Sequence, residues 1–523
     1  MKASLAPAVL AVFLVAIGSL RIVSTYTVFN HTIDEPDNLA AGMEYLSTGR
    51  YLYEDVHPPL ARVLAAAGPF LAGERFHPGP NAYGEGYRIL GTGAHYERVL
   101  ALARTGILPF FWIGSAVVFL WARRAGGAGA ALIAVLLFTT LPPILALCGI
   151  VNTDAALCAM TGAAGLGGIY WAERPDGRRS IFFGALLALA VISKFSSMPF
   201  LAAAFPLMAA AYAWSTGRSA GWVAREAWAR RRPAMWVAAT AVLLIWAAYG
   251  FTFARVGSLH MRLPAPRFFS GIMAVVAHNR RGHPSFLMGQ RSPNGFWYYF
   301  PAVLALKTPL ALFGLVGMGI WELGWKTKTG ARKVEGGLKS ATEVKLALAF
   351  SLGILLASMT GHIDIGVRFV LPVYIGLAVL AGYAAVRARS RGARILVAAL
   401  ITWQVVSGAR QHPDYLAYTN EIAGAHPERF VADSDLDWGQ DMKRLADFLQ
   451  QQHAGSVTFS PFNRTYPMPI AMLPGNTNAP SPGWNAVSVT IWKVFGYPAW
   501  ADRMPEQRRI GRSILVWYVP AAK

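Results

Sequence analysis

Long apolar stretches constrain this sequence more than any other feature. Eleven of them approach or reach the roughly 20 residues that a helix needs to cross the hydrocarbon core of a bilayer. Only 14% of the 523 residues are charged, against roughly 25% in soluble domains. The sequence therefore predicts an all-α polytopic membrane protein with about 11 transmembrane helices, at 5–25, 100–121, 127–145, 153–171, 181–193, 196–214, 234–253, 298–320, 345–359, 367–386 and 394–410.

The first apolar stretch admits two interpretations. Lys2 precedes it, as in a secretory signal peptide that is removed after export. No convincing small-residue cleavage site follows it. We therefore favour a retained membrane anchor, and a cleaved signal peptide is the alternative.

Basic residues mark one side of the membrane. The net charge of +21 comes from 48 Lys and Arg against 27 Asp and Glu, and in a chain this apolar it indicates a membrane protein, not a nucleic-acid-binding one. Cytoplasmic connections carry the excess of Lys and Arg. If all eleven spans form, the N-terminus lies inside and the C-terminus outside. The basic connections then alternate with the others, at 123–124, 174–179, 218–232, 326–339 and 387–391.

Three long segments fall on the outer side. Residues 26–98 are rich in acidic side chains, whereas 254–297 have six arginines and no acid. Residues 411–523 have no apolar run of 18 residues, and they mix a stretch with helical spacing with Val/Thr/Ile/Trp stretches. We expect a membrane domain over 1–410 that includes both loops, and a small soluble α/β domain over 411–523 with a helix at 438–452 and strands at 485–492 and 513–519.

An acidic pair stands just outside the first span, in HTIDEPDNLAAGMEYLSTGRYLYEDVHPPLARVLAA. Asp34 and Glu35 precede Pro36, and acids beside such a proline are also typical of an ordinary helix start. The functional hypothesis is that Asp34 is a general base for an acceptor hydroxyl, and that Glu35 orients it or helps to hold a divalent cation. The apolar residues that follow have helical spacing and predict amphipathic helices lying flat on the bilayer.

His57 and Arg62 follow in the same loop. His57, before two prolines, is either an ordinary loop histidine or a group that faces substrate. Arg62 either extends its guanidinium toward lipid headgroups or binds a phosphate with two hydrogen bonds.

Two more candidates lie in short outside turns. Asp154 is either an N-cap of the fourth span or a second acidic member of the site at the membrane level of Asp34. Together, Asp34 and Asp154 are the candidate metal ligands. Lys194 is the only Lys or Arg in the short outside turns, which favours a partner such as a lipid phosphate over simple headgroup contact.

Basic residues at two other places complete the candidate site. Arg280 and Arg281 lie in the acid-free loop, which either contacts anionic lipids or recognises a phosphate-bearing substrate. Arg368, in GHIDIGVRFVLP, lies at another outer span end that suits the binding of sugar or phosphate oxygens.

Four aspartates gather in the last domain, in VADSDLDWGQDMKRLADF. The Gly and terminal Glu of an EF-hand calcium loop do not fit this sequence. The favoured interpretation of Asp433, Asp435, Asp437 and Asp441 is a helix N-cap cluster, with contact to an acceptor as the alternative.

The stretches IDEPDNLAAGMEYLSTGRY, HPPLARVLAA, DIGVRFVLPVY and DSDLDWGQDMKRLADFL resemble bacterial members of the family 39 glycosyltransferases, which are similar to dolichyl-phosphate-mannose-protein mannosyltransferases and have the GT-C membrane fold. The resemblance covers most of the membrane part. It implies a bacterial inner-membrane enzyme that uses a polyprenyl-phosphate-linked sugar on the periplasmic side, with a protein, lipid or glycan acceptor. The β-trefoil insertion of eukaryotic members is missing, which argues against protein recognition of the eukaryotic kind.

The resemblance also implies roles for particular residues. Asp34, with Glu35 beside it, matches the catalytic acidic pair, His57-Pro58-Pro59 matches the HPP motif, and Asp154 matches the second acidic position. Arg62 stands where the family commonly has Lys. Members differ in their need for metal, so the resemblance implies no definite cofactor and leaves a divalent cation open. We expect one inverting displacement without a covalent enzyme intermediate.

Two other classes of function are the alternatives. A secondary transporter is expected to have charges at mid-span and two halves with broken helices, whereas here the charges gather at one face and no half-repeat is visible. A non-catalytic envelope assembly protein would use 411–523 for binding and would not need Asp34. Walker, HExxH, GxSxG and CxxC motifs are absent from the sequence.

Overall fold

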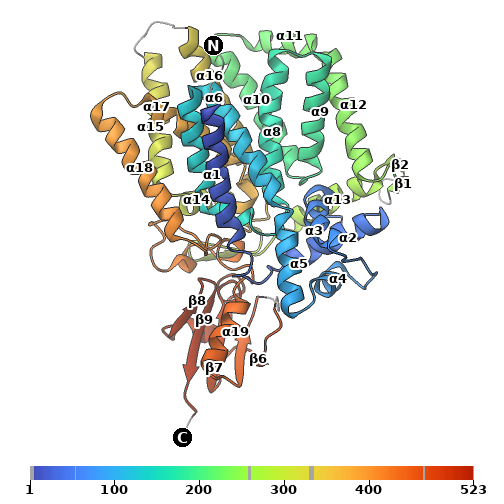
Figure 1. Ribbon diagram of the computed structural model, residues 1–523, viewed down its shortest axis with the longest axis vertical. Coiled ribbons are helices and arrows are strands. Elements are labelled where there is room, and N and C mark those ends of the chain that lie inside the picture. Colours follow the sequence, from blue (N-terminus) through green and yellow to red (C-terminus); the bar gives the residue numbers. More distant parts are fainter. Residues whose placement is uncertain (1–4, 54, 257–260, 329–334, 463–465, 522–523) are drawn as a thin grey trace.

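The computed structural model describes residues 5–53, 55–256, 261–328, 335–462 and 466–521. It is mostly helical with a small sheet domain at the C-terminal end, as predicted (Figure 1). Helix lies within each of the eleven predicted spans, in α1 (Ala6–Val23), α6 (Leu108–Thr139), α8 (Asp154–Glu173), α9 (Gly177–Val191), α10 (Ser197–Thr216), α12 (Arg231–Ala248), α14 (Tyr299–Lys307), α15 (Leu310–Lys328), α16 (Glu335–Ser358), α17 (Val373–Arg387) and α18 (Arg391–Arg410).

The number of spans stays a prediction. Among the described residues, six helices are long and apolar enough to cross a membrane, or seven if one bent pair is a single span. Helices α9 and α17 have only 15 residues each, which is about 22 Å at 1.5 Å per residue. Length and composition therefore support a multi-pass protein without fixing eleven crossings.

One predicted boundary differs from the structure, whereas another is kept. The predicted spans 100–121 and 127–145 are separate helical segments of α6 that meet at Gly127, whose φ of 79° is accessible to glycine at little cost. The second segment turns back along the first, since a Cβ on Gly114 would lie 3.4 Å from the Phe138 ring. The predicted single span 298–320 is two helices bent by 110°. Pro309 lies between them, and Thr308 before it is extended, because proline disfavours helical geometry in the preceding residue.

The three long segments predicted to lie outside occupy one end of the helical bundle (Figure 1). The first forms α2 (Glu35–Thr48), α3 (Pro59–Leu71), α4 (Ala82–Leu90) and α5 (Gly93–Thr105). The second contains β1 (Phe253–Val256), β2 (Met261–Pro264), α13 (Pro266–Arg281), β3 (Ser285–Leu287) and β4 (Gln290–Ser292). Helix α11 (Ala220–Ala229), from the basic connection 218–232, lies at the opposite end.

Helix α2 is buried, which the sequence did not predict. All residues from Glu35 to Glu44 are inaccessible, because α3 and α4 pack on either side of it. A Cβ on Gly42 would lie 2.0 Å from the Arg62 carbonyl oxygen of α3, and one on Gly86 of α4 would lie 2.1 Å from the Pro36 carbonyl oxygen. Helix α2 is therefore covered by other helices of its own loop, and its flat orientation on the bilayer stays a prediction.

The C-terminal part is a five-stranded sheet in the order β6-β5-β7-β9-β8. Strands β5 and β7 pair in parallel, and β9 runs antiparallel to both β7 and β8. Leu445 and Leu449 of α19 pack on Val457 and Val516 of the sheet, so the domain has its own core. The elements are α19 (Met442–Gln451), β5 (Ser456–Ser460), β6 (Ala471–Pro474), β7 (Gly483–Ser488), β8 (Arg508–Ile510) and β9 (Ile514–Val519).

Candidate active site

Asp34 lies at the start of α2 with its carboxylate directed away from that helix. It occupies the N-cap position, yet its side chain makes no capping hydrogen bond. Its Oδ2 lies 3.1 Å from NH1 of Arg368, and the side chain is one-third exposed. The alternative of an ordinary helix start therefore does not account for this side chain, which is both paired with a cation and accessible.

Asp154 and Lys194 form an adjoining ion pair. Asn152, rather than Asp154, caps α8, because its Oδ1 accepts from the backbone N–H groups of Asp154 and Ala155 at 2.8 and 3.0 Å. The Asp154 carboxylate is thereby free to bind Lys194 Nζ at 2.5 Å, in a pair that is nearly inaccessible. Burial lowers the pKa of Lys194, and the Asp154 charge opposes this effect.

Arg368 joins the two carboxylates. Its NH1 is 3.1 Å from Asp34 and 3.8 Å from Asp154, so one guanidinium lies between acids that are 120 residues apart in sequence. With Lys194, the site holds two cations and two carboxylates. We call these four residues the charge cluster.

The C-terminal domain holds Arg368 in place. The Arg368 guanidinium carbon lies 4.0 Å from the centre of the Trp438 ring, a cation–π contact. The backbone N–H of Val367 donates to Asp435 Oδ1 at 2.9 Å. Gly366 has a φ of 119°, and a Cβ there would lie 2.7 Å from Ser434 Oγ, so this close approach requires glycine.

Asp433 belongs to the same surroundings. Burial raises its pKa to about 7, with Arg368 opposing the rise and Asp435 and Asp34 adding to it. Its φ of 55° lies in the left-handed region, which Asp and Asn tolerate better than most residues.

Replacing Asp433 by Asn should raise stability at high pH. Because the folded-state pKa of about 7 lies above the ordinary 3.8, this side chain lowers the stability progressively as the pH rises from 3.8 to about 7, and the full cost is present above pH 7. Asp433→Asn should therefore raise the free energy of unfolding by up to about 4 kcal/mol at pH 8 and leave it unchanged near pH 3.5. Thermal unfolding across this range measures it, with Asp447→Asn on an exposed face of α19 as control. Equal effects at both pH values would contradict the assignment.

Glu35 is buried and fully bonded. Arg104 of α5 donates to both of its oxygens at 2.9 Å, and the backbone N–H groups of Thr32 and Val151 donate to them at 2.7 and 3.0 Å. Burial alone would raise the pKa of Glu35, but Arg104 and these N–H groups hold it below the ordinary 4.5. This side chain ties α2 to α5 and to the turn before α8.

Arg62 is likewise buried among partners of its own loop. Its guanidinium donates to Asn38 Oδ1 at 2.7 Å, to the Tyr51 hydroxyl at 3.0 Å and to Asp37 Oδ2 at 2.8 Å. Only 1% of the residue is exposed. These contacts join α3 to α2. They occupy the guanidinium N–H groups of Arg62 that would otherwise bind a phosphate.

His57 faces the charge cluster, whereas two predicted arginines lie apart from it. The pKa of His57 lies well below 6.5 because of burial, and then because of the nearby charges of Arg62, Lys194 and Arg368. Its Nδ1 is buried without a hydrogen-bond partner among the described residues. Arg280 and Arg281 are exposed in the last turn of α13.

The aspartates of the last domain do not form a helix cap, so that prediction is wrong. Helix α19 begins at Met442, and Asp441 before it makes no side-chain capping bond. Asp441 accepts from Ser513 Oγ at 2.7 Å, and Asp437 accepts from the backbone N–H of Thr490 at 3.1 Å. The four side chains fix the loop before α19 against the sheet and the membrane part.

The two candidate metal ligands, Asp34 and Asp154, are already paired with a positively charged side chain of the protein. Within the described part of the chain, no group of three or more His, Cys, Asp or Glu side chains could hold a metal ion. Asp34 and Asp154 instead share Arg368, so a metal ion bound by both would take the place of that guanidinium.

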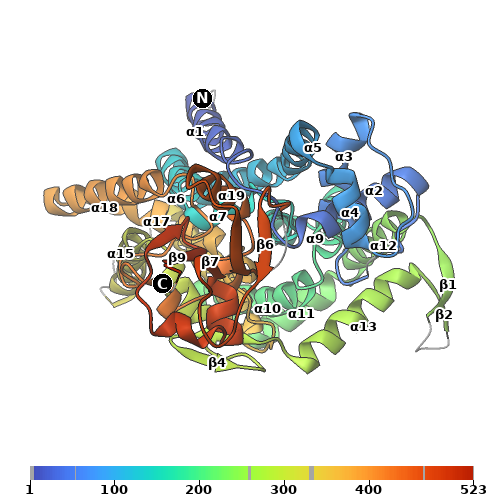
Figure 2. The same cartoon turned by 90° about the horizontal axis from the view of Figure 1, so that it is seen from below.

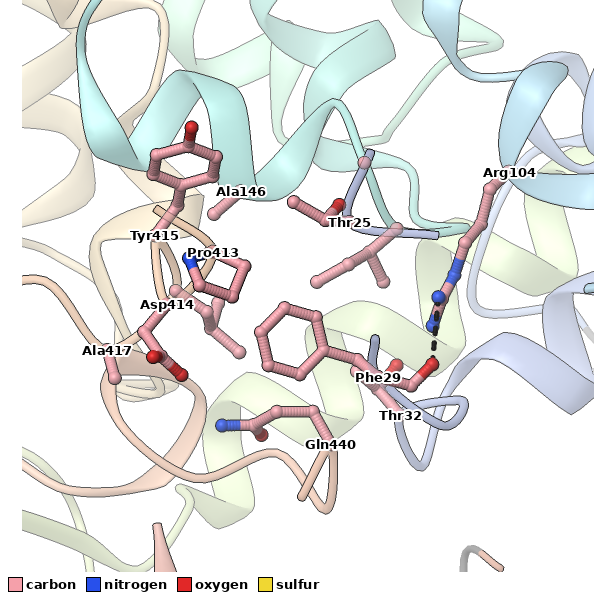
Figure 3. Close-up of a pocket in the computed structure, with 13 residues that line it drawn as sticks. Thr25, Phe29, Thr32, Arg104, Ala146, Pro413, Asp414, Tyr415, Ala417 and Gln440 are labelled. Atoms are coloured by element: carbon pink, nitrogen blue, oxygen red, sulfur yellow. Dashed lines mark hydrogen bonds between the residues drawn. The ribbon is translucent and has the colours of Figure 1, made fainter. Parts of the chain in front are cut away.

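A small cavity lies beside Arg104 (Figure 3). Phe29, Thr32, Arg104 and Gln440 line it together with the loop at 413–417, and Arg104 donates to the Phe29 carbonyl oxygen at 3.1 Å. Its volume of about 30 Å³ suffices for one or two water molecules. It is too small for a sugar.

Sequence reasoning missed the contacts that form across domains. Trp438 packs on the Arg368 guanidinium, and the charge of Arg368 acts on Asp433, from 65 or more positions away. Arg104 reaches Glu35 over 69 residues. The only signal in the sequence was that Arg104 and Arg368 each lie inside a predicted span, where an arginine needs an acidic partner.

Comparisons with known proteins support the fold. No family model matches the sequence, and no curated protein is found as a relative. Among solved structures, the chain is similar to ArnT from Cupriavidus metallidurans bound to undecaprenyl phosphate, with a TM-score of 0.51 and 13% identity over 97% of both chains. It is also similar to the archaeal oligosaccharyltransferase AglB from Archaeoglobus fulgidus, with a TM-score of 0.47 and 13% identity over 95% of this chain and 72% of that chain.

Identity this low carries information about fold and not about activity. The likeness to ArnT runs from one end of the chain to the other and includes the membrane helices and the C-terminal domain. Membership of family 39 in particular stays a prediction. What the likeness shows is that this multi-pass membrane protein has the GT-C fold.

Proposed function

We propose that this protein is an inverting glycosyltransferase that moves a sugar from a polyprenyl-phosphate donor to a hydroxyl acceptor on the periplasmic side of the membrane. The observation that carries the proposal is the charge cluster. An accessible carboxylate, Asp34, pairs with the buried Arg368, and Asp154 links this pair to a second buried cation, Lys194. That combination suits a reaction in which a hydroxyl loses a proton while a phosphate leaves.

The two cations are suited to the donor. Lys194 is 7% exposed and Arg368 10%, so water screens their charges little, and they stabilise an anion more than they would at the surface. ArnT, which shares the fold, was solved with undecaprenyl phosphate bound. We infer that Lys194 and Arg368 bind the donor phosphate here.

The chemistry then requires one displacement. The acceptor oxygen attacks the anomeric carbon, and the bond from that carbon to the phosphate oxygen breaks with both electrons remaining on the phosphate. Asp34 takes the proton of the hydroxyl, and the two cations stabilise the departing polyprenyl phosphate. Because attack and departure occur on opposite faces, the sugar is inverted, and no covalent enzyme intermediate is needed.

The remaining predicted residues receive supporting roles. Asp154 orients Lys194 through their 2.5 Å contact. Glu35 and Arg62 fix the segment that carries Asp34 through Arg104 and Asn38. We place Arg280 and Arg281 at the exposed rim, where they attract anionic substrate.

Replacing Lys194 by Gln tests the donor site. Wild-type protein in proteoliposomes, supplied with radiolabelled undecaprenyl-phosphate hexoses and pentoses and an envelope extract as acceptor, should transfer label. Loss of one buried cation from the leaving group should lower the transfer rate roughly 10²- to 10³-fold.

Lys443→Gln is the matched control, because Lys443 also pairs with an acid, Glu97, at 2.5 Å but lies away from the charge cluster. It should transfer label like the wild type. Wild-type protein that transfers no label, or Lys194→Gln protein as active as the control, would refute the proposal. Movement of intact donor across the membrane without transfer would indicate a transporter.

A further inference from the structure

A second cavity lies between the C-terminal domain and the first outside loop, separate from the charge cluster. Its volume is about 440 Å³, within the range of roughly 300–1,000 Å³ that is typical of small-molecule sites. Tyr87 and Tyr96 line it from α4 and α5, and Tyr466, Met468 and Met472 line it from the C-terminal domain. Strand β6 and helix α4 lie beyond the end of the membrane bundle (Figures 1 and 2), so a ligand would reach this cavity from water.

The cavity is built for an uncharged ligand. Its lining contains no Asp, Glu, Lys or Arg. Among the lining residues, only His31 has a side chain whose ordinary pKa lies near physiological pH. Its pKa is lowered to about 4, mainly by burial. His31 is therefore neutral at physiological pH, and the cavity offers no counter-charge to a phosphate or a carboxylate, unlike the charge cluster.

His31 has a polar atom without a partner in this lining. The Tyr96 hydroxyl accepts from the His31 backbone N–H at 2.8 Å and lies 2.9 Å from its Nδ1. If the Tyr96 hydrogen points at Nδ1, Nε2 carries the ring proton. Nε2 is buried and has no hydrogen-bond partner among the residues that the structure describes, and an unsatisfied buried donor is unfavourable. A hydroxyl oxygen of a ligand would satisfy it once the side chains that cover Nε2 move aside.

The tyrosine rings complete a surface with both apolar and polar character. Tyr87 and Tyr96 stand edge-on to His31, with ring centres 5.4 and 5.7 Å away, and Tyr466 lies 5.7 Å from Tyr96. Tyrosine offers an apolar ring face with a hydroxyl at its end. A sugar ring has the matching character, with C–H faces and hydroxyl edges.

We propose that this cavity binds a neutral pyranose ring of the acceptor glycan. The acceptor role rests on the proposed function, whereas the binding itself does not. His31 is three residues before Asp34, so their Cα atoms are at most about 11 Å apart. A glycan held by His31 and Tyr87 would therefore keep its next hydroxyl-bearing unit close to the base.

Filling the cavity tests this proposal. Wild-type protein in nanodiscs, free of sugar-headed detergent, is mixed with maltose, cellobiose and N,N′-diacetylchitobiose, and binding is read by saturation-transfer NMR. At least one disaccharide should give ring-proton signals, and Met472→Trp should abolish them. Leu473→Trp is the matched control, because adjacent side chains on β6 point to opposite faces and Leu473 is 48% exposed. Tyr87→Ala, which removes a ring without adding bulk, should also abolish the signals.

Each outcome decides the proposal. The proposal is overturned if none of the three sugars gives a signal, or if the signals survive both Met472→Trp and Tyr87→Ala. A fatty acid, decanoate, is added as an alternative ligand. Saturation transfer to decanoate and to no sugar would also overturn the proposal. Because the readout needs no turnover, sugar binding that these variants abolish supports the cavity even if the proposed transfer reaction fails. The acceptor role would be refuted if Met472→Trp protein transferred sugar at the wild-type rate and with the wild-type half-saturating concentration of acceptor.

Discussion

Asp34→Asn should reduce sugar transfer by about 10²- to 10⁴-fold, the usual contribution of a positioned general base. Asparagine has nearly the same shape, and its amide oxygen can still accept from Arg368, which lies 3.1 Å from the carboxylate. It cannot take a proton from the acceptor hydroxyl. The loss should therefore appear in the rate of transfer, while the half-saturating donor concentration stays close to that of the wild type.

The proteoliposome assay with radiolabelled undecaprenyl-phosphate sugar measures this loss. Asp55→Asn is the control, because Asp55 is also an acid of the first outside loop and pairs with Arg267 at 3.1 Å away from the charge cluster. Near wild-type transfer by folded Asp34→Asn protein would show that Asp34 is not the base. Equal losses in both variants would point to damage to the loop instead.

The membrane-level candidates could be found from the sequence because they interrupt a pattern. Asp34, Asp154 and Lys194 are charges at the ends of apolar stretches on one predicted face, and such charges are costly unless they are paired or functional. Arg368 pairs with Asp34 across 334 residues. Sequence patterns predicted that both residues lie at the same membrane level, and only the packing of the helices could show that they pair.

Other features depend on contacts that no local pattern encodes. Arg62 and Glu35 suit substrate binding by residue type, yet neighbouring helices bury both. Lys307 is tolerated inside a predicted span because its Nζ donates to the carbonyl oxygens of Leu416 and Asp435, at 2.7 and 2.5 Å. The same docking of the C-terminal domain places Trp438 on Arg368, so a prediction that treats 411–523 as a separate domain misses part of the site.

Arg104→Met should destabilise the folded protein by about 3–5 kcal/mol, since it leaves a buried carboxylate without its cation. Glu35 and Arg104 are each 1% exposed, and Arg104 also donates to the carbonyl oxygens of Tyr26, Phe29 and Asn30 at 2.7 to 3.1 Å. All of these contacts vanish with the guanidinium. We expect a lower thermal unfolding temperature and loss of monodisperse protein on size-exclusion chromatography.

The matched control is Arg98→Met, since Arg98 is an exposed arginine of the same helix, and it should change stability by no more than about 0.5 kcal/mol. Adding Glu35→Gln to Arg104→Met removes the unpaired charge and should restore part of the loss. The pH dependence gives a further check. Because the folded-state pKa of Glu35 lies below 4.5, wild-type stability from this pair is present above pH 4.5 and declines as the carboxylate is protonated, whereas the double variant should lack this decline. If the double variant is no more stable than Arg104→Met, the loss comes from the carbonyl contacts and not from the buried charge.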